Sequence, residues 1–324
     1  MKNNERIIQF YDLDLFGSSL SPSITGKING YGDINAVMNE IKIIRENNLA
    51  RKKTPGSSLK EIRLEDFEEK DDVWILLINI VDTSAAHPVT QIIGGNENDR
   101  ETITLDDTRG LESSTHVIIY KRPNKLGKYL TLYERNSSIP FHKVVSFLNN
   151  LFRICSAEVP GRYLLPHPSG QTGKTINIFC RCEGFGHPST EFLEDLGTGI
   201  LSDIRLTSDS INLKGFDAST HVELLSNEIK MSVKTNFIRS NGGNRAYIEK
   251  AITYADTFDM PYVRVSFKDE TGASHTATLS SDTALIANSD LYVRKHKIRD
   301  FGNTLKTAFP TIQTRIIDKM LELI

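Results

Sequence analysis

Residues 73–81 read VWILLINIV, the longest apolar run in the chain, and Asn79 alone interrupts it. A strand with one face in water alternates apolar and polar residues, whereas a strand buried on both faces is apolar almost throughout. The stretch 74–81 is therefore predicted to be a central strand of a sheet. The run is far shorter than the ~20 residues that a membrane-spanning helix needs, so no membrane partner is expected.

Further elements are predicted on either side of this run. Residues 6–16 alternate loosely and indicate a first strand, and the turn PNKLG at 123–127 is typical of a hairpin. Asp33 is a suitable cap for a helix, and Pro140 suits the first turn of a second one. The apolar side of the first helix comprises Ile34, Val37, Met38, Ile41 and Ile44. The apolar side of the second comprises Phe141, Val144, Val145, Leu148, Leu151 and Phe152.

The best candidate for a domain boundary is the Pro- and Gly-rich segment 158–174, EVPGRYLLPHPSGQTGK. We therefore expect an N-terminal α+β domain at 1–157, a linker at 158–174 and a C-terminal α+β domain at 175–324. The last domain is predicted to end in two helices, near 298–308 and 310–324. The expected fold class is α+β, with two mixed or largely antiparallel sheets flanked by helices and a C-terminal helical pair.

The overall charge excludes a protein that coats nucleic acid non-specifically along its whole surface. Lys and Arg number 39 against 41 Asp and Glu, a net charge of −2, whereas such proteins are strongly basic. Three cysteines are too few for a disulfide framework and point to a reducing compartment. The first residues, MKNNERIIQF, lack the apolar run of a secretory signal. A cytoplasmic protein is the expectation.

Two basic stretches are the leading functional feature. The densest is RKHKIR at 294–299, and a second is RKK at 51–53. The candidate nucleic-acid-binding residues are Arg294, Lys295, Lys297, Arg299, Arg51, Lys52 and Lys53. Basic side chains near aromatic ones can hold a phosphate backbone and stack a base, although such stretches also occur on solvated faces. The leading hypothesis is a protein that binds DNA or RNA in a bacterial accessory system such as phage defence.

A second hypothesis is a metal-dependent nuclease. Glu228 and Lys230 alternate on a predicted strand and so share one face, and Asp217 precedes them by eleven residues. This arrangement resembles the metal-binding core of the PD-(D/E)xK nucleases, although no proline precedes Asp217. The resemblance implies that Asp217 and Glu228 hold Mg²⁺ and that Lys230 helps to activate water. The alternative is an exposed strand face with no chemistry, and no other cofactor is expected.

A third polar set, Glu112, Ser114 and His116, also alternates on a predicted strand. Such side chains can perform acid–base or nucleophilic chemistry. The alternative interpretation is a row of half-exposed polar residues beside the buried Thr115 and Val117.

The third functional hypothesis is a non-enzymatic assembly or regulatory subunit that forms a homo-oligomer, or binds a protein partner, through its C-terminal helix. Apolar residues recur there in steps of four and three, as in short coiled-coil contacts, although packing on the chain's own sheet explains the same pattern. These residues are Leu305, Phe309, Ile312, Ile316, Met320 and Leu323.

Overall fold

The computed structural model describes residues 4–21, 24, 26–53, 60–105, 109–167, 173–189, 192, 194, 200–208, 227–232, 243–257, 260–268, 274–281 and 293–324. The chain divides into two compact units. The first comprises Met1–Gln9, Leu13–Glu183 and His296–Ile324, and the second comprises Phe10–Asp12 and Gly184–Lys295. The segment 158–174, which we expected to link two domains, lies inside the first unit, where Leu164–Pro166 forms strand β9.

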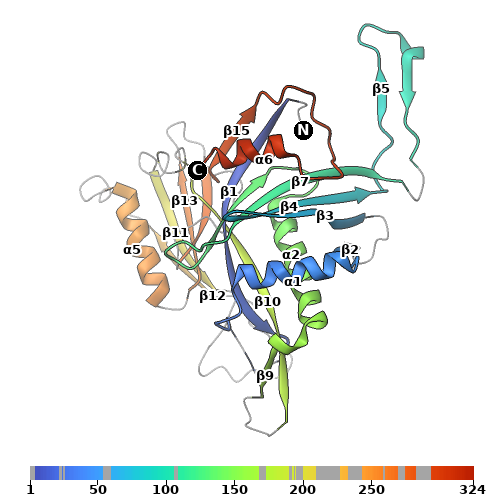
Figure 1. The fold of residues 1–324 in the computed structure, drawn as a ribbon. Helices are drawn as coiled ribbons and strands as arrows, with labels where there is room; N and C mark the ends of the chain where they lie inside the picture. Colours follow the sequence, from blue (N-terminus) through green and yellow to red (C-terminus); the bar gives the residue numbers. More distant parts are fainter. Residues whose placement is uncertain are drawn as a thin grey trace, which may run out of the picture. The chain divides into compact units, whose positions relative to one another are not determined.

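The main element of the first unit is a large curled sheet (Figure 1). Among the described residues, nine strands take the order β2-β3-β4-β7-β8-β1-β10-β9, with β15 paired to β1. They are β1 (Glu5–Ser19), β2 (Arg51–Lys53), β3 (Lys60–Lys70), β4 (Val73–Asp82), β7 (Leu111–Tyr120), β8 (Tyr129–Glu134), β9 (Leu164–Pro166), β10 (Thr175–Gly186) and β15 (Lys295–Arg299). The prediction that 74–81 is a central strand is confirmed, because β4 lies between β3 and β7 and is antiparallel to both.

Helices α1 (Ile34–Glu46) and α2 (Phe141–Glu158) cover one face of this sheet, as Figure 1 shows. The Asp33 cap is confirmed, since its carboxylate accepts a hydrogen bond from the Asn35 backbone N–H at 2.9 Å. On the sheet side, the Trp74 Nε1–H donates to Asn35 Oδ1 at 2.9 Å. The predicted apolar face of α1 is buried throughout, so this helix is held to β4 by both packing and a hydrogen bond.

The other face of β4 is covered by residues 305–324, which we call the C-terminal segment and which contain helix α6 (Thr314–Leu321). The Asn79 side-chain amide donates to the Phe309 carbonyl at 2.9 Å, and the Ile312 N–H donates to Asp66 of β3 at 2.9 Å. Ile316, Ile317 and Met320 of α6 are buried. Both faces of β4 are therefore shielded from water, which is why its sequence is almost continuously apolar.

The predicted C-terminal helical pair is wrong. Lys295–Arg299 is a strand paired to β1, and α6 is the one α-helix that follows it in the described chain. Asp300 and Gly302 have φ angles of 63° and 73°. A helix cannot pass through left-handed residues, so the chain turns there. Mixed α and β content with mostly antiparallel strands is confirmed.

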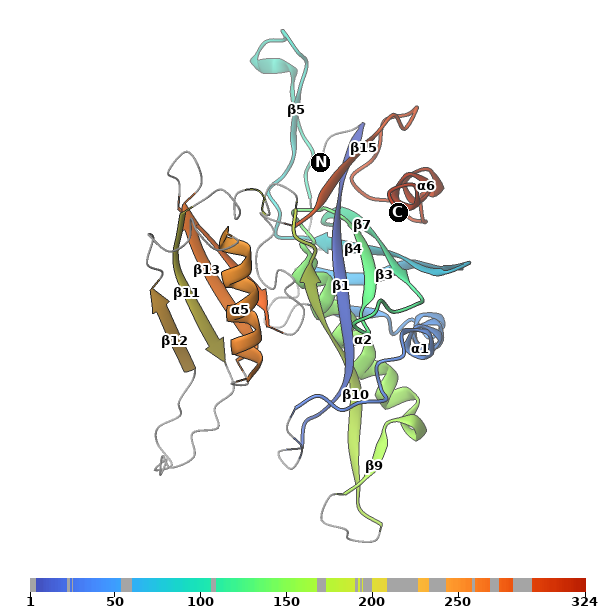
Figure 2. The ribbon, with the colours of Figure 1, turned by 90° about the vertical axis from the view of Figure 1, so that its left-hand side faces the viewer.

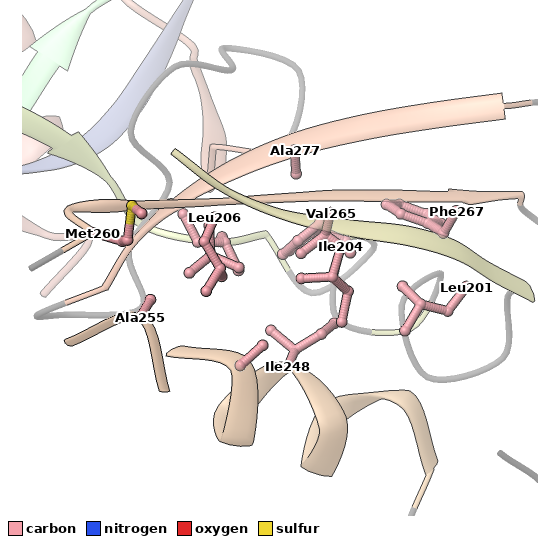
Figure 3. Close-up of a cluster of buried hydrophobic side chains, with 13 residues drawn as sticks. Leu201, Ile204, Leu206, Ile248, Ala255, Met260, Val265, Phe267 and Ala277 are labelled. Atoms are coloured by element: carbon pink, nitrogen blue, oxygen red, sulfur yellow. The ribbon is translucent and has the colours of Figure 1, made fainter. Parts of the chain in front are cut away.

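The second unit contains a four-stranded antiparallel sheet in the order β12-β11-β13-β14, with helix α5 (Gly243–Thr257) on one face (Figure 2). The strands are β11 (Ile200–Ser208), β12 (Asn227–Ser232), β13 (Tyr262–Lys268) and β14 (Ser274–Ser280). Alternation along β11 buries Ile204 and Leu206 against Ile248 of α5 (Figure 3). The intervening Arg205 points to the opposite, polar face.

A third, two-stranded sheet pairs β5 (Val89–Gln91) with β6 (Arg100–Thr102). It belongs to the first unit and projects away from the large sheet in both Figure 1 and Figure 2. We call residues 88–103 the arm.

Candidate nucleic-acid interface

The basic stretch 51–53 is β2, which forms one edge of the large sheet. Lys52 pairs with Ile62 of β3, while Arg51 and Lys53 pair with Arg63 and Glu61. Because successive side chains of a strand point to opposite faces, Lys52 lies on one face of the sheet and Arg51 and Lys53 lie on the other. The stretch therefore presents positive charge around the edge of the sheet.

On the Lys52 side there is a hollow of about 290 Å³, which we call the lysine hollow. Its apolar walls come from Ile62 of β3, Ile80 of β4 and Phe147 of α2. Its polar lining residues are Lys52, Lys60, Lys143 and Ser146. Lys60 and Lys143 were not singled out from the sequence, because they come from separate segments that only the folded sheet and helix bring together.

The charge in the lysine hollow is only partly compensated. Lys60 lies 2.7 Å from the Asp82 carboxylate. Lys52 Nζ donates to Ser146 Oγ at 3.5 Å, and Lys143 Nζ donates to the Ser138 carbonyl at 3.2 Å. Within the described ranges, no carboxylate oxygen lies within 4 Å of Lys52, Lys53 or Lys143. Unpaired ammonium groups beside a low-dielectric wall attract anions more strongly than paired ones do.

A second hollow, of about 430 Å³, lies beside Arg45, Arg51 and Arg63. These guanidinium groups already have acidic partners: Arg45 lies 3.1 Å from Asp66, and Arg63 lies 2.9 Å from Glu112. Partly exposed pairs of this kind contribute little and open readily. The arginines can rearrange toward an anion, but this hollow has less uncompensated charge than the lysine hollow.

Strand β15 contains Lys295, Lys297 and Arg299. It lies beside β1, so β3, β4, β7, β8 and β1 itself separate it from β2 within the sheet. The sheet order therefore does not place Lys297 and Arg299 next to residues 51–53. Lys297 is exposed, and no carboxylate of the described chain lies within 4 Å of it. Arg299 lies 3.4 Å from Glu5.

Arg294 precedes β15 in the second unit. Its guanidinium carbon lies 4.3 Å from the centre of the Phe10 ring, and its carbonyl accepts a hydrogen bond from the Phe10 N–H. A cation over an aromatic face gains favourable electrostatic energy. Arg294 thus already packs on an aromatic ring of its own unit.

Glu228 and Lys230 lie on β12, where both are exposed. Glu228 lies 3.1 Å from Arg205, and Lys230 lies 3.7 Å from Asp203, on the neighbouring β11. Asp217 lies outside the described residues. In the described part of the chain, no group of three or more His, Cys, Asp or Glu side chains is arranged to hold a metal ion. The nuclease hypothesis stays a prediction.

Ser114 and His116 are buried, so the interpretation of half-exposed residues is wrong for them. The C-terminal segment covers both: the Phe309 N–H donates to Ser114 Oγ at 2.8 Å, and the Gln313 N–H donates to His116 Nε2 at 3.1 Å. Since Nε2 accepts, the ring proton is on Nδ1 and donates to Glu134 at 2.6 Å. Both polar groups are occupied by the protein itself and are not open to a substrate.

Glu134 is the centre of this buried set. Its second carboxylate oxygen lies 2.6 Å from Arg6 Nε, and Arg6 also donates to the Lys306 carbonyl at 2.9 Å. We call Arg6, His116 and Glu134 the buried charge network. It joins β1, β7 and β8 to the C-terminal segment, so its role in this fold is structural.

The cysteines offer no reactive thiol. Cys155, Cys180 and Cys182 are free and buried. Burial raises the pKa of the Cys155 and Cys180 thiols to about 12. A protonated thiol is a poor nucleophile and metal ligand, so neither cysteine suggests catalysis at neutral pH.

Among the described helices, none has the length and apolar character required to cross a membrane. Neither a protein-family model, nor a curated protein, nor a solved structure matches this chain.

Proposed function

We propose that this protein binds nucleic acid, DNA or RNA, through the lysines at the β2 edge of its large sheet. The observation that carries the proposal is the unpaired positive charge of Lys52, Lys53 and Lys143. Lysines that contact phosphates release condensed counterions, which supplies most of the sequence-independent affinity for a nucleic acid.

The position of these charges on an edge favours a polymer over a small anion. Lys52 and Lys53 point to opposite faces of the sheet. One small anion is too short to contact both, whereas a phosphate backbone that passes over the edge can do so. The arginines of the second hollow add contacts when their exposed ion pairs open, and Lys297 with its neighbours on β15 provides a separate, weaker contact.

The affinity of the protein for single- and double-stranded DNA and RNA, measured by fluorescence anisotropy against salt concentration, tests this function. The double variant Lys52→Ala/Lys53→Ala is expected to bind more weakly, because it removes two phosphate contacts. Its slope of log affinity against log salt should fall by about 2 in magnitude.

The matched control is Lys125→Ala/Lys174→Ala, which removes the same charge from two exposed lysines elsewhere in the first unit. It should leave the slope unchanged. No binding of any of the four nucleic acids at low salt, or equal slopes for the two double variants, contradicts the proposal. Lys297→Glu in the same assay measures the contribution of β15.

A further inference from the structure

The arm exposes nearly all of its surface to solvent. All three residues of β5 and all three of β6 are exposed. Beside the paired strands, the Ile103 N–H donates a hydrogen bond to the Pro88 carbonyl at 2.8 Å. Figures 1 and 2 both show it extending away from the large sheet. A lone two-stranded hairpin is only marginally stable in water, so an arm of this kind gains order when it docks on another surface.

The tip of the arm is apolar. Ile92 is 68% exposed and the adjacent Ile93 is fully exposed. Val89 of β5 and Ile103, which follows β6, are exposed as well. Contiguous apolar side chains in water usually mark an interaction surface. We therefore expect the tip to bind an apolar surface of a partner.

The arm is also acidic. Glu97, Asp99 and Glu101 outnumber Arg100 in the second half of the arm. Within the described chain, no Lys or Arg side chain lies within 4 Å of these three carboxylates. The arm thus combines an apolar tip with carboxylates that no basic side chain of the described residues neutralises.

The lysine hollow has the complementary composition. Its walls are apolar (Ile62, Ile80 and Phe147), and its three lysines carry positive charge that is only partly paired. At about 290 Å³ it is at the lower limit for a small-molecule pocket, a size suited to one or two apolar side chains. The arm of the same chain does not occupy it, because Ile92 and Ile93 are in solvent.

We propose that the arm of one copy of this chain docks in the lysine hollow of a second copy. Ile92 and Ile93 would pack on Ile62, Ile80 and Phe147, and the carboxylates of the arm would face Lys52, Lys60 and Lys143. Opposite charges across such a contact set its orientation and speed its formation. This inference goes beyond the proposed function and is tested without nucleic acid.

The first test is the molar mass of the full chain by light scattering after size-exclusion chromatography, over a range of concentrations. The wild type should exceed the mass of the 36.4 kDa monomer as concentration rises. Ile92→Asp/Ile93→Asp and Lys52→Glu/Lys143→Glu should each be monomeric, since one lacks the apolar tip and the other repels the acidic arm. Ile324→Asp, at an exposed apolar residue outside both surfaces, should behave as the wild type.

The decisive test mixes the two monomeric variants. One keeps an intact hollow and the other keeps an intact arm, so the mixture should form a heterodimer that neither variant forms alone. Circular dichroism melts confirm that both variants are folded. A wild type that stays monomeric up to about 100 µM, a concentration at which contacts with micromolar Kd are populated, or a mixture that stays monomeric, would overturn the proposal.

Discussion

Replacement of Glu134 by glutamine is expected to lower the free energy of unfolding by about 3–5 kcal/mol, the usual cost of removing one partner from a buried ion pair. The side chains of Arg6 and Glu134 are each 1% exposed and 2.6 Å apart. Glutamine keeps the size of the side chain but removes the carboxylate charge that faces the buried Arg6 guanidinium. Denaturation by urea at pH 7 measures the loss.

The control for this variant is Glu69→Gln. Glu69 also accepts from two cations, Lys42 and Lys121, but it lies on the surface. Solvent screens exposed pairs, so this replacement should change stability little. A loss at Glu134 no larger than the loss at Glu69 would show that the buried charge network does not hold the fold together.

The same network predicts how stability depends on pH. Burial by itself would raise the pKa of the Glu134 carboxyl, but the facing His116 ring and the Arg6 guanidinium outweigh burial and hold that pKa below its usual value of 4.5. The stabilisation is therefore fully present above pH 4.5 and is lost as the pH falls through the lower, folded-state pKa. The wild type should lose stability in that acid range more steeply than Glu134→Gln, which has no carboxyl to protonate.

Replacement of Ile316 by alanine should destabilise the protein by about 2–5 kcal/mol, the range for an aliphatic side chain removed from a packed core. Ile316 is fully buried in α6, which covers the second face of the large sheet. The smaller side chain leaves a cavity against that face. Urea denaturation again gives the change.

Ile324 allows the same replacement at a site that is 61% exposed. Ile324→Ala should fall within about 0.5 kcal/mol of the wild type, as surface substitutions do. Equal effects at the two isoleucines would mean that α6 does not pack on the sheet in solution. The apolar spacing of the C-terminal residues would then favour a contact between copies.

Elements specified by nearby residues were predictable from the sequence. The apolar run VWILLINIV predicted β4 and its burial on both faces, and Asp33 predicted the start of α1. The C-terminal helical pair failed because pairing with β1 decides the conformation of Lys295–Arg299. Strand β1 lies near the other end of the sequence, so no pattern in the residues around 295–299 reveals the pairing.

The candidate site was predictable only in part. The basic residues of β2 are evident in the sequence, but the lysine hollow also needs Lys143 and Phe147 of α2. We assigned Val145 to the apolar side of that helix and did not include Phe147, which is buried while Val145 is only half-buried. His116 was misjudged for a similar reason, since Gln313, 197 residues further on, covers it.

The most direct test of the central claim, that nucleic acid binds at the β2 edge, is a lysine footprint. The full chain is acetylated briefly with and without a saturating oligonucleotide, and the modification at each lysine is quantified by mass spectrometry. We expect the oligonucleotide to protect Lys52 and Lys53 and to leave the reactivity of Lys125 and Lys174 unchanged. Unaltered reactivity of Lys52 and Lys53 in the presence of bound oligonucleotide would contradict it.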